Sequence, residues 1–94
     1  CSGIGRVLSK ESVGMRIERW FKRASAANGK EHYQLVASPQ VIEVLTESVS
    51  NRIKKLEKQL GLTIDLIRDT ALHPEEFHVI NAKSDTDITE KFRI

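Results

Sequence analysis

The segment between residues 38 and 61 constrains the fold more than any other part of the sequence. It opens with Ser38-Pro39, a capping hydroxyl followed by proline at the first helical position, and it ends at Gly61, a frequent helix stop. Apolar residues recur every three or four positions in between: Ile42, Leu45, Val49, Ile53, Leu56 and Leu60. The segment therefore predicts a helical layer that buries one face, with a break near Ser48, where weak helix formers cluster.

Hydrophobic periodicity predicts four further elements around this helical layer. An amphipathic helix spans residues 10–27, with Val13, Ile17, Trp20, Phe21 and Ala24 at its apolar positions. Three strands are expected at residues 32–37, 62–69 and 77–82, and the last two are expected to pair as a hairpin with a long loop. The predicted fold class is α+β, with a three-stranded sheet and helices packed on one face.

The length of 94 residues is that of one small domain. Residues 1–8 are punctuated by glycine and are interpreted as a linker, residues 9–83 as the domain, and residues 84–94 as a polar tail that is flexible or extended. Trp20 and Phe21 are interpreted as core residues, and an interface role is the alternative. No apolar run approaches the length of a membrane span and no secretory signal is recognisable, so we expect a cytoplasmic protein.

Charge alone does not indicate a nucleic-acid binder. Fifteen Lys and Arg residues stand against thirteen Asp and Glu residues, for a net charge of +2, so any basic patch must be local. Arg16, Arg19 and Arg23 share one face of the first helix, which is interpreted as a solvated face. Glu18 and Lys22, four residues apart, are expected to pair on the same helix.

The polar residues do not form a recognisable catalytic motif. Metal-dependent hydrolysis needs carboxylates that converge on divalent ions. Six acidic residues are instead interpreted as solvated: Asp65, Asp69, Glu75, Glu76, Asp85 and Asp87. His32, His73 and His78 have no cysteine or carboxylate at metal-ligand spacing, and His78 is expected to be packed or at the rim of the core. We therefore expect that the chain is not an enzyme by itself.

The opening residues Cys1-Ser2-Gly3-Ile4-Gly5 resemble the second half of the Cys-Pro-x-Cys-x-Gly-x-Gly segment of the ribonuclease E/G family. In that family the segment lies between the nuclease core and a C-terminal small domain. The order of the predicted elements and the runs 62–69 and 72–79 also resemble that small domain, so the resemblance covers residues 1 to about 83. Because the chain opens with Cys1 rather than Met, we expect it to be part of a longer protein.

This resemblance implies a structural and oligomerisation domain of an RNA endonuclease involved in RNA processing and decay. The catalytic aspartates, their magnesium site and the RNA-contacting S1 module would lie in the rest of the parent ribonuclease. Cys1 would supply one thiolate to a zinc link shared with a second protomer, and thiolate sulfur is a ligand that zinc selects. By the same resemblance, the 94 residues alone are expected to hold no cofactor, and RNA would be reached through the parent.

Residues 31–69 also resemble the core of a KH domain, which binds RNA. KH domains place Gly-x-x-Gly between two helices, where the missing side chains let the backbone approach phosphates. Here the link is Glu47-Ser48-Val49-Ser50, so the resemblance is to a KH-like core lacking the Gly-x-x-Gly loop. A free-standing KH-like RNA-binding module is therefore the alternative function. The candidate phosphate contacts, expected to be weak and salt-dependent, are Arg52, Lys54, Lys55 and Lys58.

Overall fold

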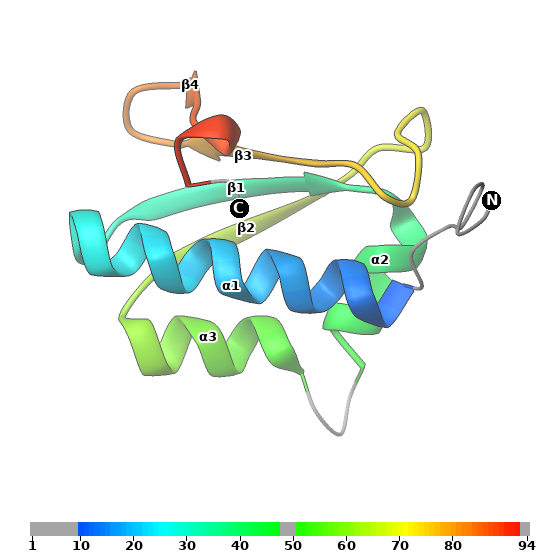
Figure 1. The fold of residues 1–94 in the computed structure, drawn as a ribbon, viewed down its shortest axis with the longest axis horizontal. Helices are drawn as coiled ribbons and strands as arrows, with labels where there is room; N and C mark the ends of the chain where they lie inside the picture. Colours follow the sequence, from blue (N-terminus) through cyan, green and yellow to red (C-terminus); the bar gives the residue numbers. More distant parts are fainter. Residues whose placement is uncertain (1–9, 48–50, 93–94) are drawn as a thin grey trace, which may run out of the picture.

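The computed structural model describes residues 10–47 and 51–92. Figure 1 shows the α-helices packed against one side of a small sheet. In chain order the elements are α1 (Lys10–Asn28), β1 (His32–Ala37), α2 (Pro39–Leu45), α3 (Arg52–Leu60), β2 (Thr63–Arg68), β3 (Phe77–Asn81), β4 (Thr86–Asp87) and the 3₁₀ helix η1 (Thr89–Phe92). The predicted first helix and strands are confirmed with small shifts at their ends, and the predicted helical layer is confirmed as two helices.

Local capping explains where α2 and α3 begin and end. The Ser38 hydroxyl accepts a hydrogen bond from the backbone N–H of Val41, and Pro39 takes the first helical position. The side chain of Asn51 accepts from the N–H of Lys54 and begins α3. Gly61 ends α3 in the left-handed conformation, at φ 69°. Ser48, where the break was expected, lies outside the described residues.

The sheet has four strands in the order β2-β1-β3-β4, so the prediction of three strands was wrong. The predicted hairpin between the second and third strands was also wrong, because β1 lies between β2 and β3. β1 pairs parallel with β2 and antiparallel with β3. The two helices α2 and α3 form the crossover that parallel neighbours require, and this connection outweighed the hairpin signal.

The C-terminal segment is packed, in contrast to the polar tail expected from residue 84 onward. β4 extends the sheet beside β3, and η1 then turns back onto β3 and α1. The Trp20 indole N–H donates to the backbone oxygen of Thr89 at 2.8 Å, and the Trp20 and Phe92 rings meet edge to face at 5.4 Å. These contacts join residues far apart in sequence, which is why local polarity did not reveal them.

The core lies between the helices and one face of the sheet. Trp20 and Phe21 are 1% and 0% exposed, which confirms the interpretation of both as core residues. In β1, residues Tyr33, Leu35 and Ala37 point into this core, while the alternate positions are half-buried or exposed. Of the predicted apolar stripe in residues 39–60, four members are buried: Ile42, Leu45, Ile53 and Leu56. Leu60 packs against the core from its edge, and Val49 lies outside the described residues.

Candidate functional site

The four candidate phosphate contacts all lie on α3. Lys54, Lys55 and Lys58 are exposed, and Arg52 is half-buried at the N-terminal end of the helix. Cys1, the proposed zinc ligand, lies outside the described residues. The helix therefore brings the four cations together, but three of the side chains are exposed to solvent and one is half-buried.

A groove runs between α1 and α3, which lie side by side and point in the same direction in Figure 1. Its volume is about 290 Å³, and it is lined by Glu18, Lys22, Arg52, Lys55, Leu56 and Gln59. Two of the candidate phosphate contacts, Arg52 and Lys55, thus face the groove together with Lys22 of α1. This cationic groove is defined by Lys22, Arg52 and Lys55, and Glu18 is the one anion among the described residues that line it.

Arg52 is held at one end of the cationic groove by α1. Its Nε lies 3.4 Å from the Glu18 carboxylate, so Glu18 faces α3 and not only its own helix. A methyl group at Gly14 would lie 3.1 Å from Arg52 Nη1 and 3.4 Å from Leu45 Cδ2, so glycine at this position leaves room for both side chains. Arg52 therefore joins α1 to α3 and is less available than Lys55 for an external ligand.

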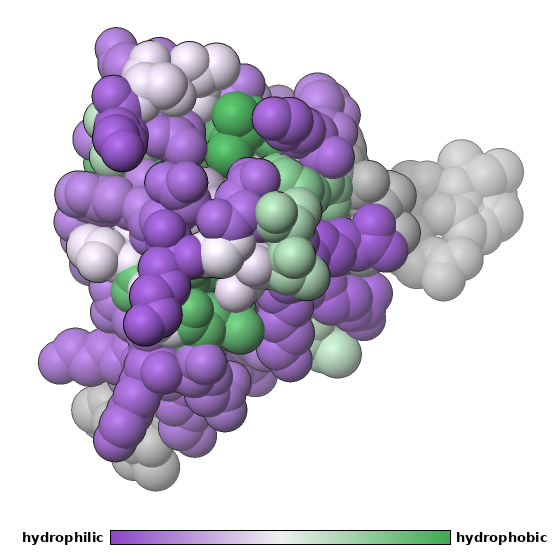
Figure 2. Space-filling model, turned by 90° about the vertical axis from the view of Figure 1, so that its left-hand side faces the viewer, coloured by the Kyte–Doolittle hydropathy of each residue, from purple (hydrophilic) through white to green (hydrophobic). Residues whose placement is uncertain are grey.

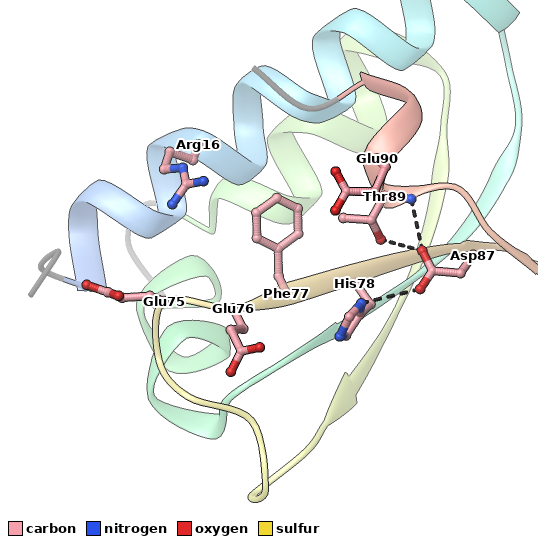
Figure 3. Close-up of a pocket in the computed structure, with 8 residues that line it drawn as sticks. All are labelled: Arg16, Glu75, Glu76, Phe77, His78, Asp87, Thr89 and Glu90. Carbon is pink, nitrogen blue, oxygen red and sulfur yellow. Dashed lines mark hydrogen bonds and ion pairs between the residues drawn. The ribbon is translucent and has the colours of Figure 1, made fainter.

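A second hollow, of about 240 Å³, lies at the edge of β3 where the short strand β4 ends (Figure 3). Four carboxylates line it, from Glu75, Glu76, Asp87 and Glu90, together with Arg16, Phe77, His78 and Thr89. Figure 3 shows the Phe77 ring pointing toward α1 and His78 on the other side of β3. Arg16 thus borders this hollow, while Arg19 and Arg23 are exposed, as expected for a solvated helix face.

Hydrogen bonds at this hollow connect Thr89, Asp87 and His78. The Thr89 hydroxyl donates to Asp87 Oδ1 and accepts the backbone N–H of Val79 at 2.7 Å. Asp87 Oδ2 lies 3.3 Å from His78 Nδ1. In a catalytic triad the histidine takes the proton of the nucleophile, whereas here the Thr89 hydroxyl is directed at the carboxylate and is 6% exposed. The arrangement fixes the C-terminal segment and does not present a nucleophile.

These contacts perturb the pKa of Asp87. Partial burial raises it, but the hydrogen bonds from the Thr89 hydroxyl and backbone N–H, with the nearby His78, outweigh burial and lower the pKa below its ordinary value of 3.8. A carboxyl whose pKa is lowered by folding stabilises the fold above its unfolded pKa. That stabilisation is lost as the pH falls through the lower folded value. Asp87 is exposed, as expected of a solvated carboxylate, but it also accepts hydrogen bonds that the sequence did not predict.

We expect acid destabilisation to depend on Asp87. Between pH 7 and about pH 3, the urea midpoint of the wild type should fall further than that of Asp87→Asn, because only the wild type loses the charged acceptor. Asp85→Asn is the matched control, since Asp85 has φ 55° and asparagine adopts this conformation readily. If Asp87→Asn and Asp85→Asn have the same pH profile, the hydrogen bonds at Asp87 do not stabilise the fold.

The other two histidines also pair with single carboxylates. His32 Nε2 lies 2.6 Å from Asp65 Oδ2 on the sheet face opposite the helices, and His73 Nδ1 lies 3.9 Å from Glu75. Within residues 10–47 and 51–92, no three His, Cys, Asp or Glu side chains are placed to hold a metal ion together. No helix in this part of the chain is long and apolar enough to cross a membrane.

The sequence did not indicate which residues of α1 face α3. Lys22 was expected to pair with Glu18 on its own helix, yet both side chains face the groove with Arg52. Glu18 and Arg52 are far apart in the sequence, so a pattern of neighbouring residues could not predict their ion pair. The Thr89–Asp87 contact carries a weak signal, since Asp followed by Thr two residues later can form a local turn.

Comparison with known proteins identifies a family for this fold. Residues 1–83 match the model of the family described as RNase E/G, Thioredoxin-like domain. No curated protein sequence matches the chain closely enough to count as a relative. The match covers most of the described fold and ends before β4 and η1. The chain therefore belongs to the RNase E/G family and contains its thioredoxin-like domain.

Proposed function

We propose that this domain is a structural and assembly unit of an RNase E/G-type endoribonuclease and that RNA cleavage resides in another part of the parent protein. The observation that carries the proposal is the family match over residues 1–83. The packing supports it, because the polar side chains at the hollow beside β3 hold the C-terminal segment in place. Under this proposal the protein acts in the cytoplasm, and its partners are the rest of the ribonuclease, a second protomer and RNA.

The outer strand β2 is the surface that best supports association with a second protomer. As the end strand of the sheet, it has one edge without a neighbouring strand, and such edges readily pair with another chain. The Glu57 carboxylate accepts the Ile64 N–H and covers only the start of this edge. Further along β2, Ile67 is 40% exposed, so a second chain pairing with this edge would cover it.

Two finer features belong to the same proposal. The unit β1-α2-α3-β2 would be a KH-like core whose inter-helix link contains no Gly-x-x-Gly, so that this link does not bind RNA as KH domains do. Cys1 would provide one thiolate of a zinc link in the intact protein. Three further donors from outside this chain would complete the tetrahedral site, and magnesium would act in the catalytic domain.

The assembly role is tested in the longer ribonuclease. Ile67→Lys is expected to lower the oligomeric mass measured by analytical ultracentrifugation, because it places a charge on the exposed outer strand. Met15→Lys, at an exposed large apolar residue of α1, is the control and should leave the mass unchanged. Equal masses for the wild type and Ile67→Lys would exclude β2 as the association surface.

The non-catalytic role has a separate test on the purified 94-residue chain. Incubation with RNA and magnesium is expected to leave the RNA intact. Magnesium-stimulated cleavage that disappears in a variant of one of the chain's own carboxylates, such as Asp65→Asn, would overturn the proposal.

A further inference from the structure

The fold separates charge in a way that the net charge of +2 conceals. α1 and α3 together carry nine cationic and three anionic side chains, whereas the other residues carry six cationic and ten anionic ones. Because the two helices lie side by side on one face of the sheet, their net charge of +6 is concentrated there. A polyanion would therefore be attracted to this face and repelled by the rest of the molecule.

The cationic groove between α1 and α3 gives this charge a defined location. Lys22 and Lys55 line it from opposite helices, and Gln59 adds an amide that can donate hydrogen bonds. Both lysines are exposed, and neither takes part in an ion pair in the part of the chain that the structure describes. Glu18 pairs with Arg52, so its carboxylate is directed at the half-buried cation and not at the two exposed lysines.

We infer that the cationic groove binds the phosphodiester backbone of single-stranded RNA, as an auxiliary contact of the ribonuclease proposed above. Because Lys22 and Lys55 line one groove from two adjacent helices, a single extended strand lying along the groove can contact both cations. Lys22 and Lys55 make the phosphate contacts, and Arg52 positions α3 against α1. The interaction is electrostatic and independent of base sequence, so it weakens steeply as salt rises.

The surface of the groove favours RNA over an acidic protein. Protein interfaces depend on apolar and aromatic anchor residues at their centre. Among the described residues, the only apolar side chain lining this groove is Leu56, which is 3% exposed. Figure 2 views the molecule from the C-terminal ends of α1 and α3, and hydrophilic side chains form most of the surface in its lower part, around a small hydrophobic patch. A ligand would therefore be held in the groove mainly by electrostatic attraction and not by apolar contacts.

The test uses the full 94-residue chain and a fluorescein-labelled oligouridylate, with fluorescence anisotropy followed from low to physiological salt. Lys22→Gln/Lys55→Gln is expected to weaken binding at low salt by about tenfold. It should also reduce the slope of log K against log salt by about 1.4, or about 0.7 for each lost phosphate contact. Lys83→Gln/Lys91→Gln removes the same charge from β3–β4 and η1, away from α3, and should change affinity less than twofold by the same reasoning.

A gain in affinity provides evidence that a folding defect cannot imitate. Glu18→Gln removes the anion of the groove and is expected to tighten RNA binding by about two- to fivefold at low salt. Circular dichroism confirms that each variant is folded. The inference is overturned if no binding occurs at low salt, if both lysine pairs lose affinity equally, or if Glu18→Gln binds no tighter. Displacement of the RNA by polyglutamate at equal charge concentration would also overturn it, in favour of an acidic protein partner.

Two further measurements separate this inference from the proposed function on which it rests. If the 94-residue chain does not bind RNA but the longer protein still associates through β2, the inference about the groove is wrong and the proposed assembly role stands. Cleavage of the oligouridylate by the 94-residue chain, seen on a denaturing gel, removes the non-catalytic role even if the groove binds as expected.

Discussion

Replacing Trp20 with alanine is expected to lower the free energy of unfolding by about 3–5 kcal/mol. Trp20 is 1% exposed, and its ring contacts Phe21, Tyr33 and Phe92 in edge-to-face geometry at 5.1–5.8 Å. The variant loses this packing and the indole hydrogen bond to the backbone of Thr89. Because small domains are stabilised by only about 5–15 kcal/mol in total, Trp20→Ala should be close to unfolding at room temperature.

The measurement is urea denaturation followed by far-ultraviolet circular dichroism, because the substitution removes the fluorescent residue. Met15→Ala is the control on the same helix, since Met15 is 48% exposed and should change the free energy of unfolding by less than about 0.5 kcal/mol. Trp20→Phe should fall between the two, as it keeps much of the ring packing and loses the hydrogen bond. A loss below about 1 kcal/mol for Trp20→Ala would mean that α1 does not pack on this core.

Removing residues 84–94 is expected to cost about 3–5 kcal/mol, although the family match ends at residue 83. The truncation removes Thr89 and the partly buried Ile88 and Phe92, which pack against the core. It also leaves the buried Val79 N–H without the Thr89 hydroxyl that accepts its hydrogen bond. An unsatisfied buried donor typically costs about 1–3 kcal/mol, so this single contact is a large part of the effect.

Two substitutions at Thr89 separate the hydrogen bond from the packing. Thr89→Val keeps the shape and removes the acceptor for Val79, so it should cost about 1–3 kcal/mol. Thr89→Ser keeps the hydroxyl and is expected to retain most of the stability. Urea midpoints of the three proteins and the truncated chain give the comparison. If the chain ending at residue 83 were as stable as the full chain, β4 and η1 would not be part of the cooperative fold.

Local signals in the sequence predicted the helices and the main strands. Ser38-Pro39 and Gly61 marked the ends of the helical layer because a capping hydroxyl, a ring-locked φ and a left-handed glycine act within a few residues. Apolar spacing predicted the buried face of α1, including Trp20 and Phe21. Each of these interactions depends on neighbours along the chain, so the sequence is sufficient to identify it.

The order in which the strands pair could not be predicted from local signals, because it depends on contacts between distant parts of the chain. β2 and β3 follow one another and are joined by a turn-rich segment, which favours a hairpin, yet β1 lies between them. The helical crossover from β1 to β2 supplies a competing signal for parallel pairing, and burial of the helices against one sheet face decides between the two. The fourth strand is only two residues long, which is below what hydrophobic alternation can reveal.

The candidate site divides in the same way. The amino-acid sequence by itself determined that α3 carries Arg52, Lys54, Lys55 and Lys58, because a helix fixes the positions of residues close in the chain. Only the tertiary structure decided that Lys22 joins Lys55 at one groove, that Glu18 holds Arg52, and that Thr89 closes the core beside Trp20. The physical reason is that packing of apolar faces brings these residues together across long separations, whereas helix propensity and capping act only between near neighbours.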